Sequence, residues 1–105
     1  MPDTAAVVVT EAPQRSRYEA HMGGELAGWC EYSLTSEMLV FTHTEVHPEF
    51  EGRGVGSALA RYALDDVRCR GSRALAVRPF ILGWIHRHPD YAELEYRSGT
   101  RPDVD

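Results

Sequence analysis

The hydrophobic pattern of the first half of the chain is typical of short strands. Apolar or β-branched residues alternate with polar residues, and the runs end at turn-forming residues such as the Gly23-Gly24 pair. The runs cover residues 7–10, 15–22, 26–34 and 38–46. Because consecutive strands joined by tight turns usually pair with each other, this half predicts an antiparallel meander.

The second half of the chain has helical spacing instead. Apolar residues recur at every fourth position over residues 54–70, which predicts a helix. We expect a short strand at 73–77 and a second helix at 79–88, which begins at a proline and ends before one. Residues 91–97 suit either a short final strand or a last turn. A helix between two strands forms a βαβ crossover, so the strands at 38–46 and 73–77 should be parallel.

The length and composition of the chain indicate one small domain with one modest hydrophobic core. We expect a single domain over residues 1–105, with a core formed by about residues 7–96 and a loose tail at 98–105. The net charge is −5 and lysine is absent. Because a nucleic-acid-binding surface needs a basic stripe, we expect no nucleic-acid partner, and cationic partners such as amines are favoured.

The location of the protein is predicted from what its sequence lacks. No apolar stretch is long enough to span a membrane, and the first residues show no signal-peptide pattern. Cys30 and Cys69 lie too far apart for a metal or redox motif. We therefore expect a cytoplasmic protein with free thiols and no membrane partner.

The most informative segment is residues 51–57, which read Glu-Gly-Arg-Gly-Val-Gly-Ser directly before the predicted helix. Glycines let backbone N–H groups approach a ligand closely, and a helix start adds unpaired N–H donors and the positive end of the helix dipole. This segment predicts a site for a pyrophosphate. The mononucleotide P-loop needs a lysine, which this chain lacks, and the dinucleotide fingerprint needs Gly or Ala where this chain has Ser57, so neither motif fits.

Together with its neighbours, this loop resembles the GNAT superfamily of N-acetyltransferases, and in particular a small single-domain branch, the YjdJ-like acetyltransferases. The matching segments are residues 41–48, 50, 52–59, 79–80, 84–85 and 87–91. The resemblance covers roughly residues 7–96. It implies an α+β domain with the three-layer-like GNAT fold, in which an antiparallel meander precedes a βαβ unit with splayed parallel strands.

The resemblance also implies a function, namely the transfer of an acetyl group from acetyl-CoA to an amine. Coenzyme A would be held by the loop backbone, by exposed backbone where the parallel strands splay apart, and by the helix at 79–88. The implied cofactor-binding residues are Val46, Gly52, Arg53, Gly54, Val55, Gly56, Ser57, Phe80 and Trp84. The acceptor would be an amine of a small molecule, a peptide or a protein, and the enzyme would be a monomer or a homodimer.

Two positions depart from the family pattern. The superfamily loop usually opens with Gln or Arg, whereas this one opens with Glu51; we expect that carboxylate to point away from the pyrophosphate, with Arg53 offsetting its charge. Some members of the small branch carry a cysteine before the Pro-Phe pair, where this chain has Arg78, so an acetyl-cysteine route is not available. These departures support an alternative, a catalytically weak module that binds CoA or acetyl-CoA as a sensor or partner-binding domain.

Direct attack on the thioester needs a neutral amine and a route for its proton. His43 and Glu45 are two residues apart on a predicted strand and therefore share a face. They are the candidate catalytic residues, since an imidazole and a carboxylate can accept the proton directly or through water. Alternatively, they hydrogen-bond each other or the sheet edge and only shape the site. With His47 they would offer zinc ligands, but the His47-Pro48 pair turns out of the strand, so we expect no metal.

Overall fold

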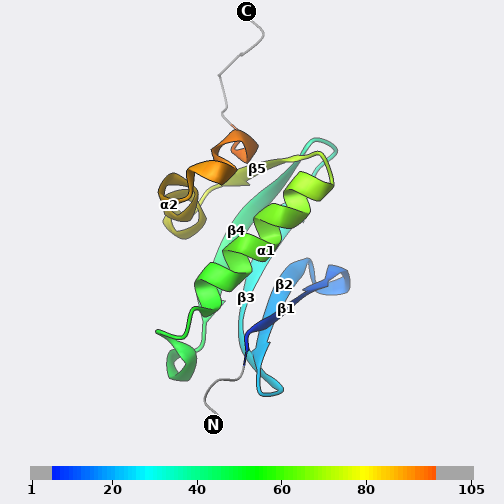
Figure 1. Cartoon of the computed structure of the whole chain (residues 1–105). Helices are drawn as coiled ribbons and strands as arrows, with labels where there is room; N and C mark the ends of the chain where they lie inside the picture. The colour runs from blue at the N-terminus through cyan, green and yellow to red at the C-terminus, as the bar shows by residue number, and fades with distance from the viewer. Residues whose placement is uncertain (1–5, 97–105) are drawn as a thin grey trace, which may run out of the picture.

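The computed structural model describes residues 6–96 of the chain, and Figure 1 shows their arrangement. Five strands form one sheet in the order in which they occur along the chain, antiparallel from β1 to β4, with β5 parallel to β4. The strands are β1 (Val8–Ala12), β2 (Arg17–Met22), β3 (Glu25–Leu34), β4 (Met38–Val46) and β5 (Arg73–Ala76). The predicted meander and parallel pair are both confirmed.

Two α-helices and three 3₁₀ segments complete the described chain. The helices are α1 (Val55–Cys69) and α2 (Pro79–Arg87), and the 3₁₀ segments are η1 (Pro13–Arg15), η2 (Pro48–Phe50) and η3 (Pro89–Leu94). The ambiguous segment at 91–97 combines both expectations, because η3 is followed by a single parallel bridge between Glu95 and Ala74. The tail predicted at 98–105 lies outside the described residues.

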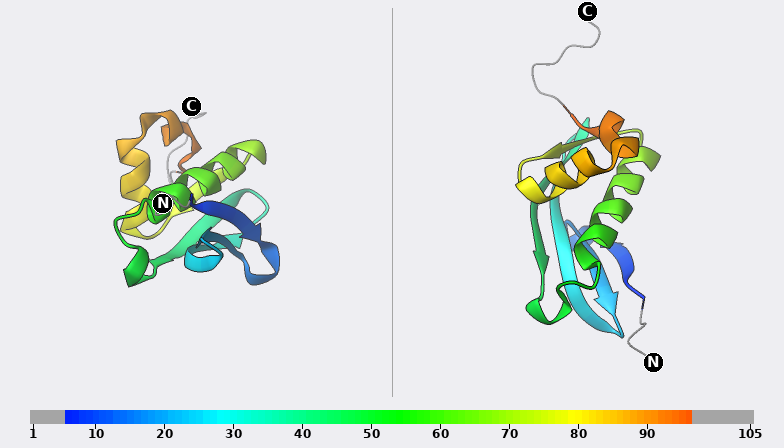
Figure 2. Two further views of the ribbon diagram at one scale, coloured as in Figure 1. Left: turned by 60° about the horizontal axis from the view of Figure 1, so that its bottom comes forward. Right: turned by 60° about the vertical axis from the view of Figure 1, so that its left-hand side comes forward.

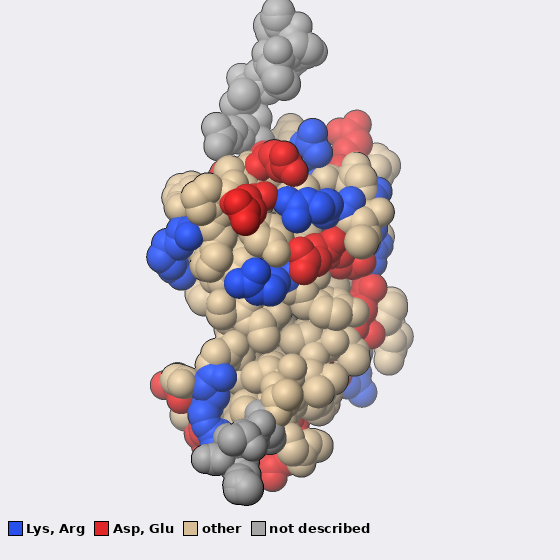
Figure 3. Space-filling view, in the orientation of Figure 1, with Lys and Arg blue, Asp and Glu red and all other residues tan. Residues whose placement is uncertain are grey.

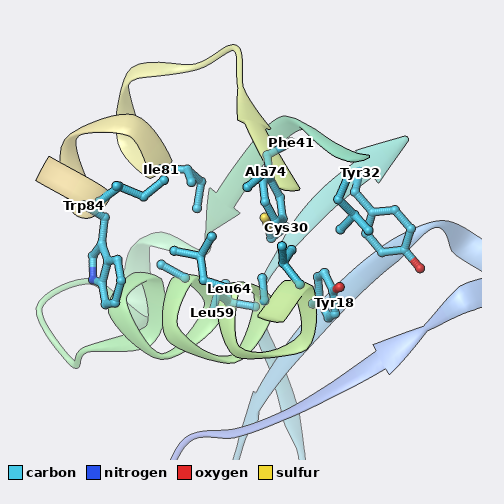
Figure 4. Close-up of a cluster of buried hydrophobic side chains, with 14 of the residues drawn as sticks. Tyr18, Cys30, Tyr32, Phe41, Leu59, Leu64, Ala74, Ile81 and Trp84 are labelled. Carbon is cyan, nitrogen blue, oxygen red and sulfur yellow. The ribbon is translucent and has the colours of Figure 1, made fainter. Parts of the chain in front are cut away.

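The helices cover one face of the sheet. Figures 1 and 2 show α1 crossing the sheet diagonally, with α2 beside the β5 end. Between them and the strands lies a single apolar core, and the close-up in Figure 4 shows how its side chains converge from the sheet and both helices. The largest side chains with under 2% exposure include Trp84, Tyr18, Phe41, Leu39, Leu59, Leu64, Ile81 and Ile85.

Polar contacts fix the C-terminal end of α1 to the first strands. Arg70 donates to both carboxylate oxygens of Glu11 on β1, each at 2.9 Å, and to Asp66 one turn earlier. The hydroxyl of Tyr18, on β2, donates to the same Asp66 carboxylate at 2.7 Å. Burial and this carboxylate raise the pKa of Tyr18, so its hydroxyl remains a donor. These contacts hold α1 across the sheet and thereby set the position of its N-terminus.

The surface of the helix-covered side carries charges of both signs. In Figure 3, acidic and basic side chains are interspersed over the upper part of this side, and a largely uncharged band crosses the middle. Within residues 6–96, no helix has the length and apolar character needed to cross a membrane.

Candidate functional site

The glycine loop connects β4 to α1 through η2. Gly52 and Gly54 have φ angles of 79° and 82°, in the left-handed region that favours glycine. Beyond the adjacent residues, no atom lies within 4 Å of a β-carbon built at either position. The two glycines are therefore needed for the direction of the backbone and not for close packing.

The loop presents a row of unpaired backbone donors. Before the row, the N–H of Glu51 donates to Pro48; after it, the N–H of Ala58 donates to Gly54. Within the described part of the chain, none of the six N–H groups of residues 52–57 donates a hydrogen bond of normal length and angle to another backbone group. The first turn of α1 contains no acidic residue, so the positive end of the helix dipole adds to these donors. This arrangement is suited to an anion, as the sequence predicts.

The charged residues of the loop are both at the surface. Glu51 and Arg53 are exposed, and neither forms an ion pair with any residue between 6 and 96. Arg53 is therefore available to an anion in the loop. The expected outward orientation of Glu51 stays a prediction.

Helix α2 packs directly against the start of α1. A side-chain carbon added at Gly56 would lie 2.9 Å from the ring of Phe80, so only glycine allows this contact. Phe80 is 37% exposed and leaves part of its ring beside the loop. Trp84 differs, because it is 1% exposed and its indole N–H donates to the Ser57 hydroxyl at 2.8 Å. Its contact with the loop therefore passes through Ser57.

The parallel strands part long before β4 ends. Their pairing runs from Met38 and Arg73 to Phe41 and Ala76, with one further hydrogen bond of 3.4 Å from the Val77 N–H to the Phe41 carbonyl. Among the described strands, only β3 pairs with residues 42–46 of β4. The second half of β4 thus has an open edge toward the end of β5. Val46 lies at the far end of this edge, and the opening itself begins at residue 42.

A bulge at Thr42 decides which way the second half of β4 faces. In the pairing with β3, Phe41 lies opposite Tyr32 and His43 lies opposite Glu31, so Thr42 is an extra residue. Side chains alternate along a strand, and one extra residue reverses the alternation beyond it. As a result, Thr44 follows Phe41 on the helix-covered face, where its hydroxyl contacts the buried Cys30 thiol at 3.5 Å.

The same bulge places both candidate catalytic residues on the face opposite the helices. The Nε2 atom of His43 lies 2.9 Å from Oε1 of Glu45, and both side chains are nearly half exposed, at 43% and 45%. The sequence prediction that the two share a face is confirmed, as is their mutual hydrogen bond, which was the alternative to a catalytic role. A bond through one carboxylate oxygen leaves the other oxygen for a second partner, so the contact is compatible with both interpretations.

The surroundings of this pair are polar and aromatic. On the neighbouring strand β3, Trp29 lies opposite Glu45 and Glu31 lies opposite His43. The Trp29 indole donates to Glu31 at 2.8 Å. The His47 ring meets the Trp29 ring edge-on, with centroids 5.6 Å apart. His47 thus continues this face beyond the end of the strand. Among the described residues, no group of three or more His, Cys, Asp or Glu side chains is placed to hold a metal ion.

The cysteines occupy contrasting positions. Cys30 is fully buried, and burial raises the pKa of its thiol to about 11. Cys69, the last residue of α1, is exposed, and both thiols are free. A buried thiol with a raised pKa is a poor nucleophile, so Cys30 is a residue of the hydrophobic core.

Arg78 is the residue of the site that the sequence pointed to least clearly. It stands between β5 and α2, and its Nε donates to the carbonyl of Thr42 at 3.1 Å. The side chain therefore crosses the opening at the point where the two strands part. Its partner is a backbone carbonyl at a bulge, and no sequence motif predicts such a contact.

Comparison with known proteins gives one family and several similar structures. The family model described as GCN5-related N-acetyl-transferase matches residues 17–94. No curated protein matches the chain. An NMR structure of a GCN5-like protein from Staphylococcus aureus, itself only proposed to be an N-acetyltransferase, has a TM-score of 0.66 at 14% identity, over 93% of this chain and 96% of that one.

Two further structures with the same fold belong to larger proteins. The ribosomal-protein-alanine N-acetyltransferase from Brucella melitensis biovar Abortus 2308 has a TM-score of 0.56 at 19% identity, over 85% of this chain and 67% of that one. AAC(6')-Iy, in complex with the bisubstrate analogue CoA-S-monomethyl-acetylneamine, has a TM-score of 0.53 at 19% identity, over 81% and 67%. At these identities the similarity shows a shared fold.

Proposed function

Because the chain belongs to the GCN5-related N-acetyltransferase family, we propose that it transfers an acetyl group from acetyl-CoA to an amine. The observation that carries the proposal is the row of unpaired N–H groups at residues 52–57, directly beside the open edge of β4. A ligand with a pyrophosphate at one end and an amide-containing arm suits both features at once. One similar structure, AAC(6')-Iy, is bound to an analogue that contains CoA, which supports the choice of ligand.

In this proposal the donor is held mainly by backbone. The pyrophosphate accepts hydrogen bonds from the N–H groups of residues 52–57, and Arg53 adds a positive charge. The exposed part of the Phe80 ring flanks the ligand. The pantetheine arm, whose amides can donate and accept as a strand does, lies along residues 42–46, where β5 no longer pairs.

The chemistry is a direct attack. The amine nitrogen bonds to the thioester carbonyl carbon, the C–S bond breaks, and the sulfur leaves as a thiolate that takes up a proton. The attacking nitrogen loses its proton to Glu45, directly or through water, and the bond from His43 orients the carboxylate at 2.9 Å. Both residues face the side of the sheet opposite α1, so the acceptor would arrive from that side.

Two finer statements belong to the same proposal. The chain would be a member of the small YjdJ-like branch, which its residues 79–80, 84–85 and 87–91 resemble. The similar S. aureus protein, 96% of which is covered, is of comparable size. The free state of both cysteines suits a cytoplasmic location.

A thiol-release assay tests the proposal. Acetyl-CoA is mixed with polyamines, amino acids and basic peptides over a range of pH, and free CoA is measured while calorimetry reports binding. We expect both CoA binding and release of thiol with at least one amine class. Binding without turnover on any amine would instead support the second candidate, a CoA-binding sensor or partner-binding module, which the departures at Glu51 and Arg78 favour. Absence of binding would reject both.

A further inference from the structure

Arg78 holds an unusual position in the sheet. Backbone pairing between β4 and β5 ends with the Val77 N–H on the Phe41 carbonyl. The next carbonyl of β4, that of Thr42, is bound by the Nε of Arg78 at 3.1 Å. The Arg78 side chain thus makes the next hydrogen bond to β4 beyond the last backbone bond between β4 and β5. This bond fixes the position of the side chain although the residue is exposed.

The guanidinium is fixed but its charge is not neutralised within the described chain. Residues 6–96 contain ion pairs for four other arginines, namely Arg15, Arg17, Arg68 and Arg70. Arg78 has no carboxylate within 4.0 Å among these residues, and its two terminal nitrogens have no hydrogen-bond partner there. The first turn of α2, which starts at the next residue, has no acidic side chain. A fixed guanidinium with two free N–H₂ groups matches a carboxylate well.

We propose that Arg78 binds a carboxylate of one of the two reactants at the start of the opening between β4 and β5. The inference rests on the proposed function, which places the reacting thioester along the open edge of β4. If the donor is acetyl-CoA, the carboxylate belongs to the acceptor, for example an amino acid. If the donor is an acyl-CoA that ends in a carboxylate, such as succinyl-CoA, it belongs to the acyl group. Arg78 would therefore determine specificity for an anionic reactant.

Measurements of ligand binding, without turnover, test whether the carboxylate belongs to the acyl group of the donor. Calorimetry compares two unreactive thioethers, 3-carboxypropyl-CoA and propyl-CoA, which differ only by the terminal carboxylate. The acceptor side is tested by comparing kcat/KM, with acetyl-CoA as donor, for amino acids and for the amines that lack only the carboxylate. We expect a preference for the carboxylate of roughly tenfold or more on one of the two sides. It should disappear in Arg78→Gln and weaken in Arg78→Lys, which retains the charge and loses the planar fork.

Arg73→Gln is the matched control. Arg73 is an exposed arginine at the start of β5, the strand that precedes Arg78, and it has no carboxylate partner in the described chain, so its substitution should leave the preference unchanged. The proposal is overturned if the wild-type protein prefers the carboxylate on neither side, or if the preference survives in Arg78→Gln. If the protein binds CoA and releases thiol while Arg78→Gln has no effect, only this inference fails. If the wild-type protein does not bind CoA at all, the proposed function fails with it.

Discussion

The two faces of the sheet differ in the polarity of their side chains. The face under α1 and α2 is apolar, and its side chains, such as Tyr18 and Phe41, are nearly inaccessible to solvent. On the opposite face no helix of the described chain packs, and the side chains pair with one another through hydrogen bonds and ring contacts. Stability should therefore depend on the covered face and chemistry on the bare one. The bulge at Thr42 lets a single strand serve both.

The covered face is tested most severely by Phe41→Ala. Phe41 is 1% exposed and is the last residue of β4 that pairs on both sides. Removing a buried phenylalanine leaves a cavity, so the free energy of unfolding should fall by about 3–5 kcal/mol. Urea denaturation measures this directly. A loss below about 1 kcal/mol would mean that this face contributes less to stability than its burial indicates.

The next largest effect is expected at the start of α1, in the proposed CoA-binding loop. Gly54→Asp places a carboxylate beside the unpaired N–H groups at the start of α1, where it would compete with a bound phosphate. We expect CoA binding to be abolished in calorimetry. The fold should survive, because aspartate tolerates the left-handed conformation better than most residues and no atom lies within 4 Å of the added carbon.

Gly54→Asn is the control for this variant. It has the same shape and conformational preference without the charge, so it should retain much more of the affinity for CoA. Equal losses in the two variants would assign the effect to the backbone and not to charge. Gly56→Asp, which would also block the loop, is less informative, because an added side chain there meets the ring of Phe80.

Much of this architecture is predictable from the sequence, because it is encoded locally. The strand expected at residues 38–46 is observed with the same bounds, and the helix expected at 54–70 is observed at Val55–Cys69. Alternation, four-residue spacing and glycine content are properties of neighbouring residues. The candidate anion site follows from the same local signals.

The bulge at Thr42 is not predictable in this way. Strict alternation from Leu39 and Phe41 would place His43 and Glu45 on the covered face, whereas the extra residue places them on the bare one. A bulge arises from how two strands fit together, and its position is not marked in the sequence of either strand. The bond from Arg78 to the Thr42 carbonyl depends on that bulge, so it was equally hidden.

The bare face is tested by Glu45→Gln. If Glu45 accepts the proton of the amine, kcat should fall by about 100-fold, at the low end for a general base because water can reach this half-exposed pair. KM for acetyl-CoA and the free energy of unfolding should stay close to wild type, the latter within about 0.5 kcal/mol. His43→Ala should lower kcat in the same direction. Steady-state kinetics and thermal unfolding on the same samples separate the two quantities.

Glu31→Gln is the matched control for chemistry on this face. Glu31 is also a carboxylate on the bare face with one donor, the Trp29 indole, but it lies on β3, away from the open edge. Its substitution should change kcat much less. If Glu45→Gln and His43→Ala both keep the wild-type rate, the proton leaves by another path, and the contact between His43 and Glu45 only shapes the site.

The smallest effect is expected for Glu19→Gln, which measures how much stability the bare face provides. Glu19 is the one buried charged residue among the described residues, at 8% exposure, and it accepts hydrogen bonds from Arg17 at 2.8 Å and Arg15 at 3.0 Å. The bond from Arg17 is the main reason that the pKa of Glu19 lies below its usual value of 4.5. A lowered pKa stabilises the fold at any pH above 4.5, and this contribution is lost as the pH falls through the folded-state pKa.

Glu19→Gln should therefore cost about 1–2 kcal/mol at pH 7, and its difference from wild type should shrink below pH 4.5 in urea titrations. Glu25→Gln, at an exposed carboxylate on the first residue of β3, should stay within about 0.5 kcal/mol throughout. A cost for Glu19→Gln as large as that of Phe41→Ala would show that the bare face supports the fold as strongly as the covered one.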